Sequence, residues 1–271
     1  MEITLKELLN HATFQTHLTE AISRVKAQPD NSAARELLFK LYCIEGDWHN
    51  ALAQLEIVKL LDTEYTKRVE LYKNLVMSEL LRARVLAGDM APVGLEAQMP
   101  DWVARLHDAN QRLAAGDEAD AEHLRQQAFE MAPLTPGDGD GDGDGDGDGV
   151  VPFSWIADGD GRLGPVCEFI CAGGYRWVPF AALRELKILR PVDILDLLWL
   201  PAQATLADGQ FQGYIPARYP LMTDATQDTK LGSLTDWQRI SDSLWIGRGR
   251  KMLITDKAEY ALPDIRELRF D

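Results

Sequence analysis

Glycine followed by aspartate interrupts the helical pattern of this chain three times, at residues 46–47, 88–89 and 116–117. A glycine there can adopt the left-handed backbone conformation that ends a helix. Ala51 comes five residues after Gly46, and Ala121 comes five residues after Gly116, the spacing of a tetratricopeptide-type hairpin in which a small residue lets the second helix approach closely. The first half of the chain is therefore predicted to consist of paired antiparallel helices.

The repeats are degenerate. The three glycines are 42 and 28 residues apart (88 minus 46 and 116 minus 88), and Pro92, Gly94 and Pro100 interrupt the middle unit. A plain helical bundle with glycine at its corners remains an alternative.

The length of 271 residues and a hydrophobic content of 46% favour two domains, which we expect at residues 1–136 and 150–271. The first residues are amphipathic and contain early acids, so no signal peptide is expected, and no apolar run is long enough to span a bilayer. A cytoplasmic protein is predicted. Cys43, Cys167 and Cys171 are expected to be buried small hydrophobic residues, without a metal or another cofactor.

The net charge of −15 is spread over the whole chain: −7 in residues 1–136, −6 in residues 137–149 and −2 in residues 150–271. Nucleic acid and anionic membranes would repel such a chain, because binding to phosphate needs clustered Lys and Arg. The short basic cluster at Arg248, Arg250 and Lys251 is predicted to be a hairpin turn with solvated charges.

Residues 137–149 alternate glycine and aspartate and contain no apolar side chain. This composition predicts a flexible linker between the domains. The alternative is weak calcium binding, since Asp138, Asp140 and Asp142 match the start of an EF-hand loop. The twelfth position of that loop, however, is Gly149, where a bidentate glutamate is required.

Beyond residue 150 the sequence is typical of short strands between turn residues, and it holds five of the seven tryptophans. A helix is predicted over 166–172, a hairpin at Asp208-Gly209 and another at Gly247–Gly249. Strands are predicted over 175–178, 185–189, 197–206, 210–216, 243–247, 251–255 and 264–270. The second domain is therefore expected to be an antiparallel sheet with one or two helices, which makes the chain α+β.

Five ordered motifs resemble the ImpE family, also called TagJ or SciE-type. They are Trp155-Ile156-Ala157-Asp158, Arg162-Leu163-Gly164-Pro165, Tyr175-Arg176-Trp177-Val178-Pro179-Phe180, Trp199-Leu200-Pro201-Ala202 and Ile215-Pro216-Ala217-Arg218-Tyr219-Pro220. The segment from Leu41 to Trp48 is similar to one in the tetratricopeptide-like half of that family, so the resemblance covers nearly the whole chain.

The resemblance implies a non-enzymatic accessory protein of bacterial type VI secretion. It implies binding to an N-terminal helix of the small subunit of the contractile sheath, and assistance in sheath handling alongside the AAA+ ATPase. The chain departs from the family pattern in its glycine-aspartate tract and in Gly161, where a serine is common. Both changes put flexible backbone at the domain junction.

The residues themselves show no nucleophile with a base, metal-ligand cluster or phosphate loop, so no enzymatic activity is predicted. The alternative is an enzyme or small-ligand-binding protein with a polar site in the second domain, formed by Asp158, Arg162, Tyr175 and Arg218. A deep pocket over those four residues would favour it.

Stacked helical hairpins leave a groove that can hold a partner helix. The residues expected to face it are Glu36, Lys40, Cys43 and Ile44 on the first hairpin and Val103, Leu106, Asn110 and Leu113 on the second; ordinary packing within the chain is the alternative. Two hairpins are too few to be stable alone. The helical half is therefore expected to dock on the second domain, through Trp155 and Phe153.

Overall fold

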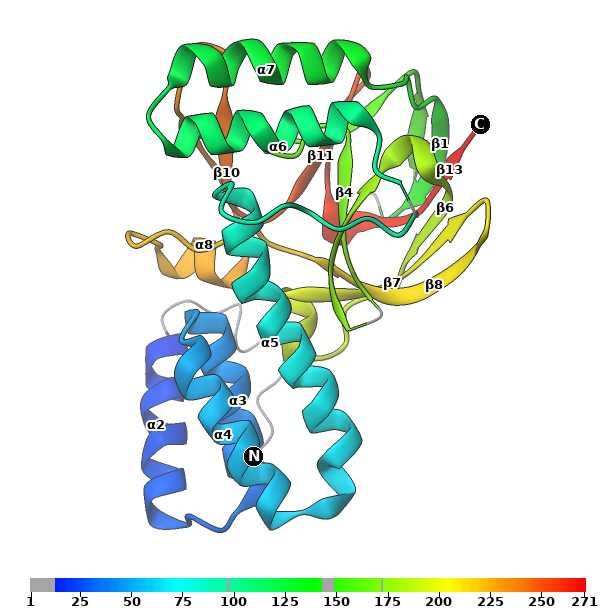
Figure 1. The fold of residues 1–271 in the computed structure, drawn as a ribbon. Helices are drawn as coiled ribbons and strands as arrows, with labels where there is room; N and C mark the ends of the chain where they lie inside the picture. The colour runs from blue at the N-terminus through cyan, green and yellow to red at the C-terminus, as the bar shows by residue number, and fades with distance from the viewer. Residues whose placement is uncertain (1–12, 97, 143–148, 172) are drawn as a thin grey trace.

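The computed structural model describes residues 13–96, 98–142, 149–171 and 173–271, in which a series of helices is followed by antiparallel strands (Figure 1). This order confirms the α+β class. None of the described helices is long and apolar enough to cross a membrane. The helices are α2 (Phe14–Ala27), α3 (Ser32–Glu45), α4 (Trp48–Leu61), α5 (Thr66–Leu86), α6 (Asp101–Ala114), α7 (Glu118–Met131) and the short α8 (Gln227–Leu231). The strands are β1 (Gly137–Gly141), β2 (Gly149–Phe153), β3 (Ile156–Asp158), β4 (Val166–Cys171), β5 (Gly174–Pro179), β6 (Leu183–Ile188), β7 (Trp199–Leu206), β8 (Gly209–Pro216), β9 (Thr235–Arg239), β10 (Trp245–Gly249), β11 (Met252–Thr255), β12 (Glu259–Ala261) and β13 (Ile265–Phe270).

The glycine-aspartate pairs form the predicted corners of two helical hairpins. Gly46 has φ +81° and ends α3, and the amides of residues 46 and 47 donate to the last carbonyls of that helix. The Asp47 carboxylate then accepts from the Asn50 amide and caps α4. Gly116 makes the same corner between α6 and α7 at φ +80°. Ala51 and Ala121 are buried where the paired helices approach each other.

The third pair, Gly88-Asp89, ends a helix without opening a hairpin. Gly88 has φ +80°, and a Cβ at this position would lie 2.6 Å from the backbone of Gln111, so the end of α5 lies directly against α6. The 21-residue α5 runs between α2–α4 at one end of the molecule and α6–α7 at the other (Figure 1). The two hairpins are therefore separated by α5 and do not stack on each other.

The eight-stranded antiparallel sheet has the order β2-β1-β13-β6-β7-β8-β4-β5. β7 and β8 form the hairpin predicted at Asp208-Gly209, with Leu206 opposite Gly209. Two smaller sheets, β10-β9 and β12-β11-β3, complete the domain. The segment after α5 covers the edge strand β5, since the Trp177 amide donates to the Val93 carbonyl.

Two local predictions in this domain are wrong. The helix expected over 166–172 is the strand β4, whose six residues are all buried. A short apolar run with no solvent-facing side shows no alternation, so its periodicity does not distinguish a buried strand from a helix. The hairpin expected at Gly247–Gly249 is also absent, because these residues lie inside β10, which pairs with β9. Lys251, expected to be solvated there, is 1% exposed.

The linker predicted for residues 137–149 is wrong for its first residues, while residues 143–148 lie outside the described part of the chain. Gly137–Gly141 is strand β1, which pairs with β13 on one side and β2 on the other. Arg269 pairs with Asp138 at 2.8 Å and with Asp140 at 3.0 Å, and Asp142 pairs with Arg190 and Arg266. The sheet thus supplies the hydrogen bonds and counter-charges that the tract lacks by itself, so residues 137–141 are a strand of the sheet.

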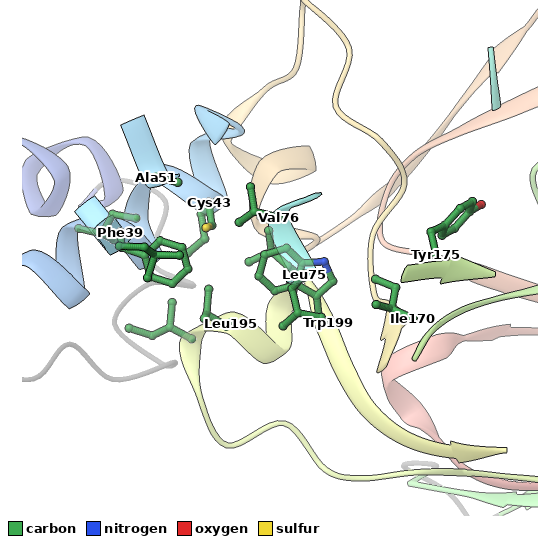
Figure 2. Close-up of a cluster of buried hydrophobic side chains, with 14 of the residues drawn as sticks. Phe39, Cys43, Ala51, Leu75, Val76, Ile170, Tyr175, Leu195 and Trp199 are labelled. Atoms are coloured by element: carbon green, nitrogen blue, oxygen red, sulfur yellow. The ribbon is translucent and has the colours of Figure 1, made fainter. Parts of the chain in front are cut away.

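A continuous apolar core joins the first helices to the sheet. Figure 2 shows Cys43 of α3 and Val76 of α5 beside Trp199 of β7, with Leu195 of the preceding turn next to them. The helical half therefore docks on the second domain as expected, but not through the expected residues. Phe153 packs in a separate core on the sheet, 6.3 Å from Phe270 between ring centroids, and Trp155 is 39% exposed.

Candidate functional site

Of the four residues predicted to form a polar site, Asp158, Tyr175 and Arg218 belong to a buried network of polar and charged groups between α5 and the second domain. Asp158, Tyr175 and Arg218 are between 1% and 4% exposed, and the side chain of Arg162 is 14% exposed. Asp158 and Tyr175 meet through the buried groups Glu168 and Lys251, whereas Arg162 and Arg218 make other contacts. We call Asp158, Glu168, Tyr175, Arg218 and Lys251, together with Glu79 and Arg82 of α5, the joint network.

Glu168 of β4 is the centre of the joint network. Arg82 contacts both of its carboxylate oxygens, with Nε to Oε1 and Nη2 to Oε2 at 2.7 Å each. Lys251 Nζ lies 2.6 Å from Oε2, and the Tyr175 hydroxyl donates to Oε1 at 2.5 Å. Burial opposes ionisation of Glu168, but Arg82 and Lys251 outweigh it and hold its pKa well below the usual value. The carboxylate is therefore ionised and fully partnered.

Asp158 of β3 lies at the other end of Lys251, and the two side chains form a close ion pair. Its carboxylate also accepts from the Tyr219 hydroxyl at 3.1 Å and from the Asp160 amide at 2.9 Å. Burial, with the repulsion of Glu168 and Asp160, raises the pKa of Asp158 to about 6 against the attraction of Lys251. Asp158 is thus a group in this network that titrates near neutral pH.

Arg218 joins the second domain to the end of α3. Its guanidinium donates to the carbonyls of Ile44 at 2.8 Å and Cys43 at 2.9 Å, and it also donates to the Lys230 carbonyl. A cation at the C-terminal end of a helix is favoured by the carbonyls that have no partner within the helix. Arg162 instead pairs with its neighbour Asp160, from Nη2 to Oδ2 at 2.6 Å.

The joint network holds two parts of the chain together. Glu79 and Arg82 belong to α5, while their partners Trp199, Glu168 and Arg218 belong to the second domain; the Trp199 indole donates to Glu79 at 2.9 Å. The charges of the network are paired, and three of the four predicted residues, Asp158, Tyr175 and Arg218, are buried. Within the described residues, no group of three or more His, Cys, Asp or Glu side chains is placed to hold a metal ion.

Most of the residues predicted to face a partner groove are covered by the chain itself. Cys43, Ile44, Val103 and Leu106 have no exposed surface, and Asn110 is 1% exposed. The structure leaves no open groove over these five residues, because they are buried by packing within the chain. Glu36, Lys40 and Leu113 are partly exposed.

The contacts of the two hairpins show what occupies the predicted groove. On the first hairpin, Lys40 pairs with Asp193 of the second domain at 2.7 Å. On the second, the Asn110 amide donates to the Arg162 carbonyl at 3.1 Å, and Arg125 donates to the Gly161 carbonyl at 3.0 Å. The alternative of packing within the chain is therefore correct for these faces.

Sequence reasoning missed Arg82, Glu168 and Lys251. Glu168 does leave a signal, since it is a single charge among buried apolar residues in a strand-like segment, whereas Lys251 follows Arg248 and Arg250 and does not stand out. A lone charge in such a segment must find a buried counter-charge. Its partner Arg82 is 86 residues away, on a helix whose pattern gives no sign of it.

Comparison with known proteins covers almost all of this chain. The family model described as "ImpE protein" matches residues 151–269. The type VI secretion system accessory component TagJ of Pseudomonas aeruginosa strain PAO1 is 38% identical over 268 residues, which are 98% of this chain and 90% of that protein. Among solved structures, the crystal structure of protein VPA1032 from Vibrio parahaemolyticus has a TM-score of 0.87 and 25% identity, and the match covers 98% of this chain and 97% of that one.

The matches to TagJ and to VPA1032 cover the helical half as well as the sheet domain, and these are the two parts that the apolar core joins in this chain. The chain therefore belongs to the ImpE family, of which TagJ is a member.

Proposed function

We propose that this protein is a non-enzymatic accessory component of a type VI secretion system, working in the cytoplasm through protein contacts. The observation that carries the proposal is the 38% identity, over 98% of the chain, with a protein named as such a component. We further propose, from the family resemblance, that it binds the N-terminal helix of the small sheath subunit and assists sheath handling indirectly with the AAA+ ATPase.

The structure supports a binding role in two ways. The joint network is buried and its charges are paired, which suits a rigid scaffold better than chemistry on a bound substrate. The apolar core also runs from the helices into the sheet, so the two halves present fixed surfaces to a partner. A rigid surface loses little conformational entropy when a partner helix binds to it.

Fluorescence anisotropy tests the proposal. The probe is a labelled peptide of the N-terminal helix of the small sheath subunit from the same secretion system, titrated with the full chain. Saturable binding is expected, and a peptide of the same composition in scrambled order should not bind. If the native peptide binds no better than the scrambled one, the proposed partner is wrong.

A further inference from the structure

A surface pocket of about 350 Å³ lies beside the corner of the first hairpin. Its wall includes the segment between β8 and α8, among them Leu221 and Met222, and Leu234 at the start of β9. Leu221 packs against the hairpin corner, since a Cβ added at Gly46 would lie 2.7 Å from its Cδ1 atom. The pocket is therefore formed by the second domain, and one residue of its wall, Leu221, touches the corner of the first hairpin.

The pocket exposes apolar side chains to water. Met222 is 37% exposed and Leu234 is 39% exposed, and both line the opening. Exposed methionine next to exposed leucine is common on surfaces that bind apolar side chains, because the flexible thioether adapts to the shape of a partner. A volume at the small end of the range for ligand pockets has room for one or two partner side chains.

The rim of the pocket carries an excess of negative charge. Asp224, Asp228 and Asp236 contribute three carboxylates, and Arg248 contributes one guanidinium, which pairs with Asp224 at 3.0 Å. The whole chain, at a net charge of −15, adds to this negative potential. A cationic side chain next to an apolar one would find complementary groups here, whereas an acidic segment would be repelled.

We propose that this pocket is the docking site for an apolar side chain of a helical partner segment that carries Lys or Arg within one turn of it. The apolar side chain enters between Met222 and Leu234, and the cation contacts Asp224 or Asp236. This inference rests on the proposed function, because it assigns the partner helix to a place on the chain. The pocket is offered as the binding place in place of the groove predicted on the two helical hairpins, whose residues are buried within the chain.

Two double variants of the full chain test the two parts of the site by anisotropy with the small sheath subunit peptide. Met222→Ser with Leu234→Ser removes the apolar opening and should raise Kd by about tenfold or more, as truncation of interface anchors does. Asp224→Asn with Asp236→Asn should raise Kd several-fold at low salt and flatten its dependence on salt. These side chains are exposed, so thermal melting should show folded variants.

Matched controls change the same residue types elsewhere on the surface. Met131→Ser with Leu189→Ser alters side chains that are 48% and 60% exposed, and Asp242→Asn with Glu259→Gln removes two exposed charges. Both controls should leave Kd within about twofold of the unsubstituted chain, which is a negligible free-energy difference.

NMR spectroscopy tests the site without any substitution, on the full chain labelled with ¹³C at the methionine methyl groups. Addition of the peptide should shift the Met222 resonance and leave that of Met131 in place. If the chain binds the peptide but the pocket variants bind as tightly and Met222 does not move, the inference is wrong and the proposed function stands. If the unsubstituted chain does not bind the peptide, both are wrong.

Discussion

Replacing Arg82 by methionine tests whether the joint network holds the helical half on the sheet. Methionine keeps the long apolar stem of the arginine and suits the helix α5. It removes the two 2.7 Å contacts to Glu168, the contact to Glu79 at 3.2 Å, and the hydrogen bond to the Arg218 carbonyl at 3.0 Å. Glu168 would keep Lys251 and Tyr175 as partners.

The expected cost follows from burial. The side chains of Arg82 and Glu168 are 1% and 0% exposed, so the variant leaves a carboxylate with half its counter-charge in a site closed to bulk solvent. Removal of one partner from a buried ion pair costs about 3–5 kcal/mol, and the remaining Lys251 favours the lower end of that range. For a chain of this size, about 3 kcal/mol corresponds to a fall in Tm of roughly 6–12 °C.

Arg68→Met is the matched control on the same helix. Arg68 pairs with Glu36 at 3.3 Å, but its side chain is 53% exposed, so its loss should cost less than about 1 kcal/mol. Urea denaturation followed by circular dichroism measures the free energy of unfolding of both variants. Because Arg82 and Glu168 share one interaction, Arg82→Met and Glu168→Gln should together cost less than the sum of their separate effects.

Two results would contradict a stabilising role of the joint network: equal small effects of Arg82→Met and Arg68→Met, or costs of Arg82→Met and Glu168→Gln that simply add. Either result would mean that the apolar core around Trp199 and Val76 holds the halves together without help from the buried charges.

Three further predictions concern packing, pH and the dependence of one half on the other. Gly139→Ala should destabilise the chain by about 1–3 kcal/mol in urea denaturation, because its Cβ would lie 2.2 Å from the Glu267 carbonyl oxygen. The control Gly209→Ala should change the stability little, because a Cβ there would have nothing within 4 Å. Equal effects of the two substitutions would contradict the close packing of β1. The pKa of Asp158 is raised from 3.8 to about 6, so the folded chain binds a proton there that the unfolded chain releases. The free energy of unfolding should therefore rise as the pH falls from about 7 to about 5. It should fall again below about 4.5, because Glu168, whose pKa is lowered, then loses its stabilising charge. An Asp158→Asn variant with the same rise would contradict the assignment of that rise to Asp158. A fragment ending at residue 136 should aggregate in sedimentation experiments, because Cys43, Ile44 and Val76 lose the side chains that cover them, and a soluble fragment with cooperative melting would contradict it.

Features with a short-range cause could be predicted from the sequence. Gly46 and Gly116 end helices because of their own backbone freedom, and Ala51 and Ala121 mark the close approach of helices a few residues away. The hairpin at Asp208-Gly209 and most strands beyond residue 174 were found for the same reason, since turn residues and alternation are local signals.

Features that depend on distant residues could not be predicted. The glycine-aspartate tract is a linker by composition, and β1 becomes a strand because β13 brings Arg269 to Asp138 and Asp140 from about half a chain away. The partner groove could not be predicted correctly for the same reason. Cys43 and Ile44 have the spacing of a groove, but only the position of the second domain decides that the chain itself covers them.

The position of α5 links these outcomes to the way a partner can bind. In a continuous stack of repeats, neighbouring hairpins bury each other and leave one concave face for a partner. Here α5 separates the two hairpins, and each makes polar contacts with the second domain, through Lys40 to Asp193 on the first and Asn110 to Arg162 on the second. Any partner helix must therefore use a surface that remains after this docking, such as the pocket of the second domain whose Leu221 packs against Gly46. A partner bound there would contact the segment that carries Leu221, and Leu221 keeps its position by packing on Gly46, so the affinity should depend on the docking of the helical half that Arg82 and Glu168 stabilise.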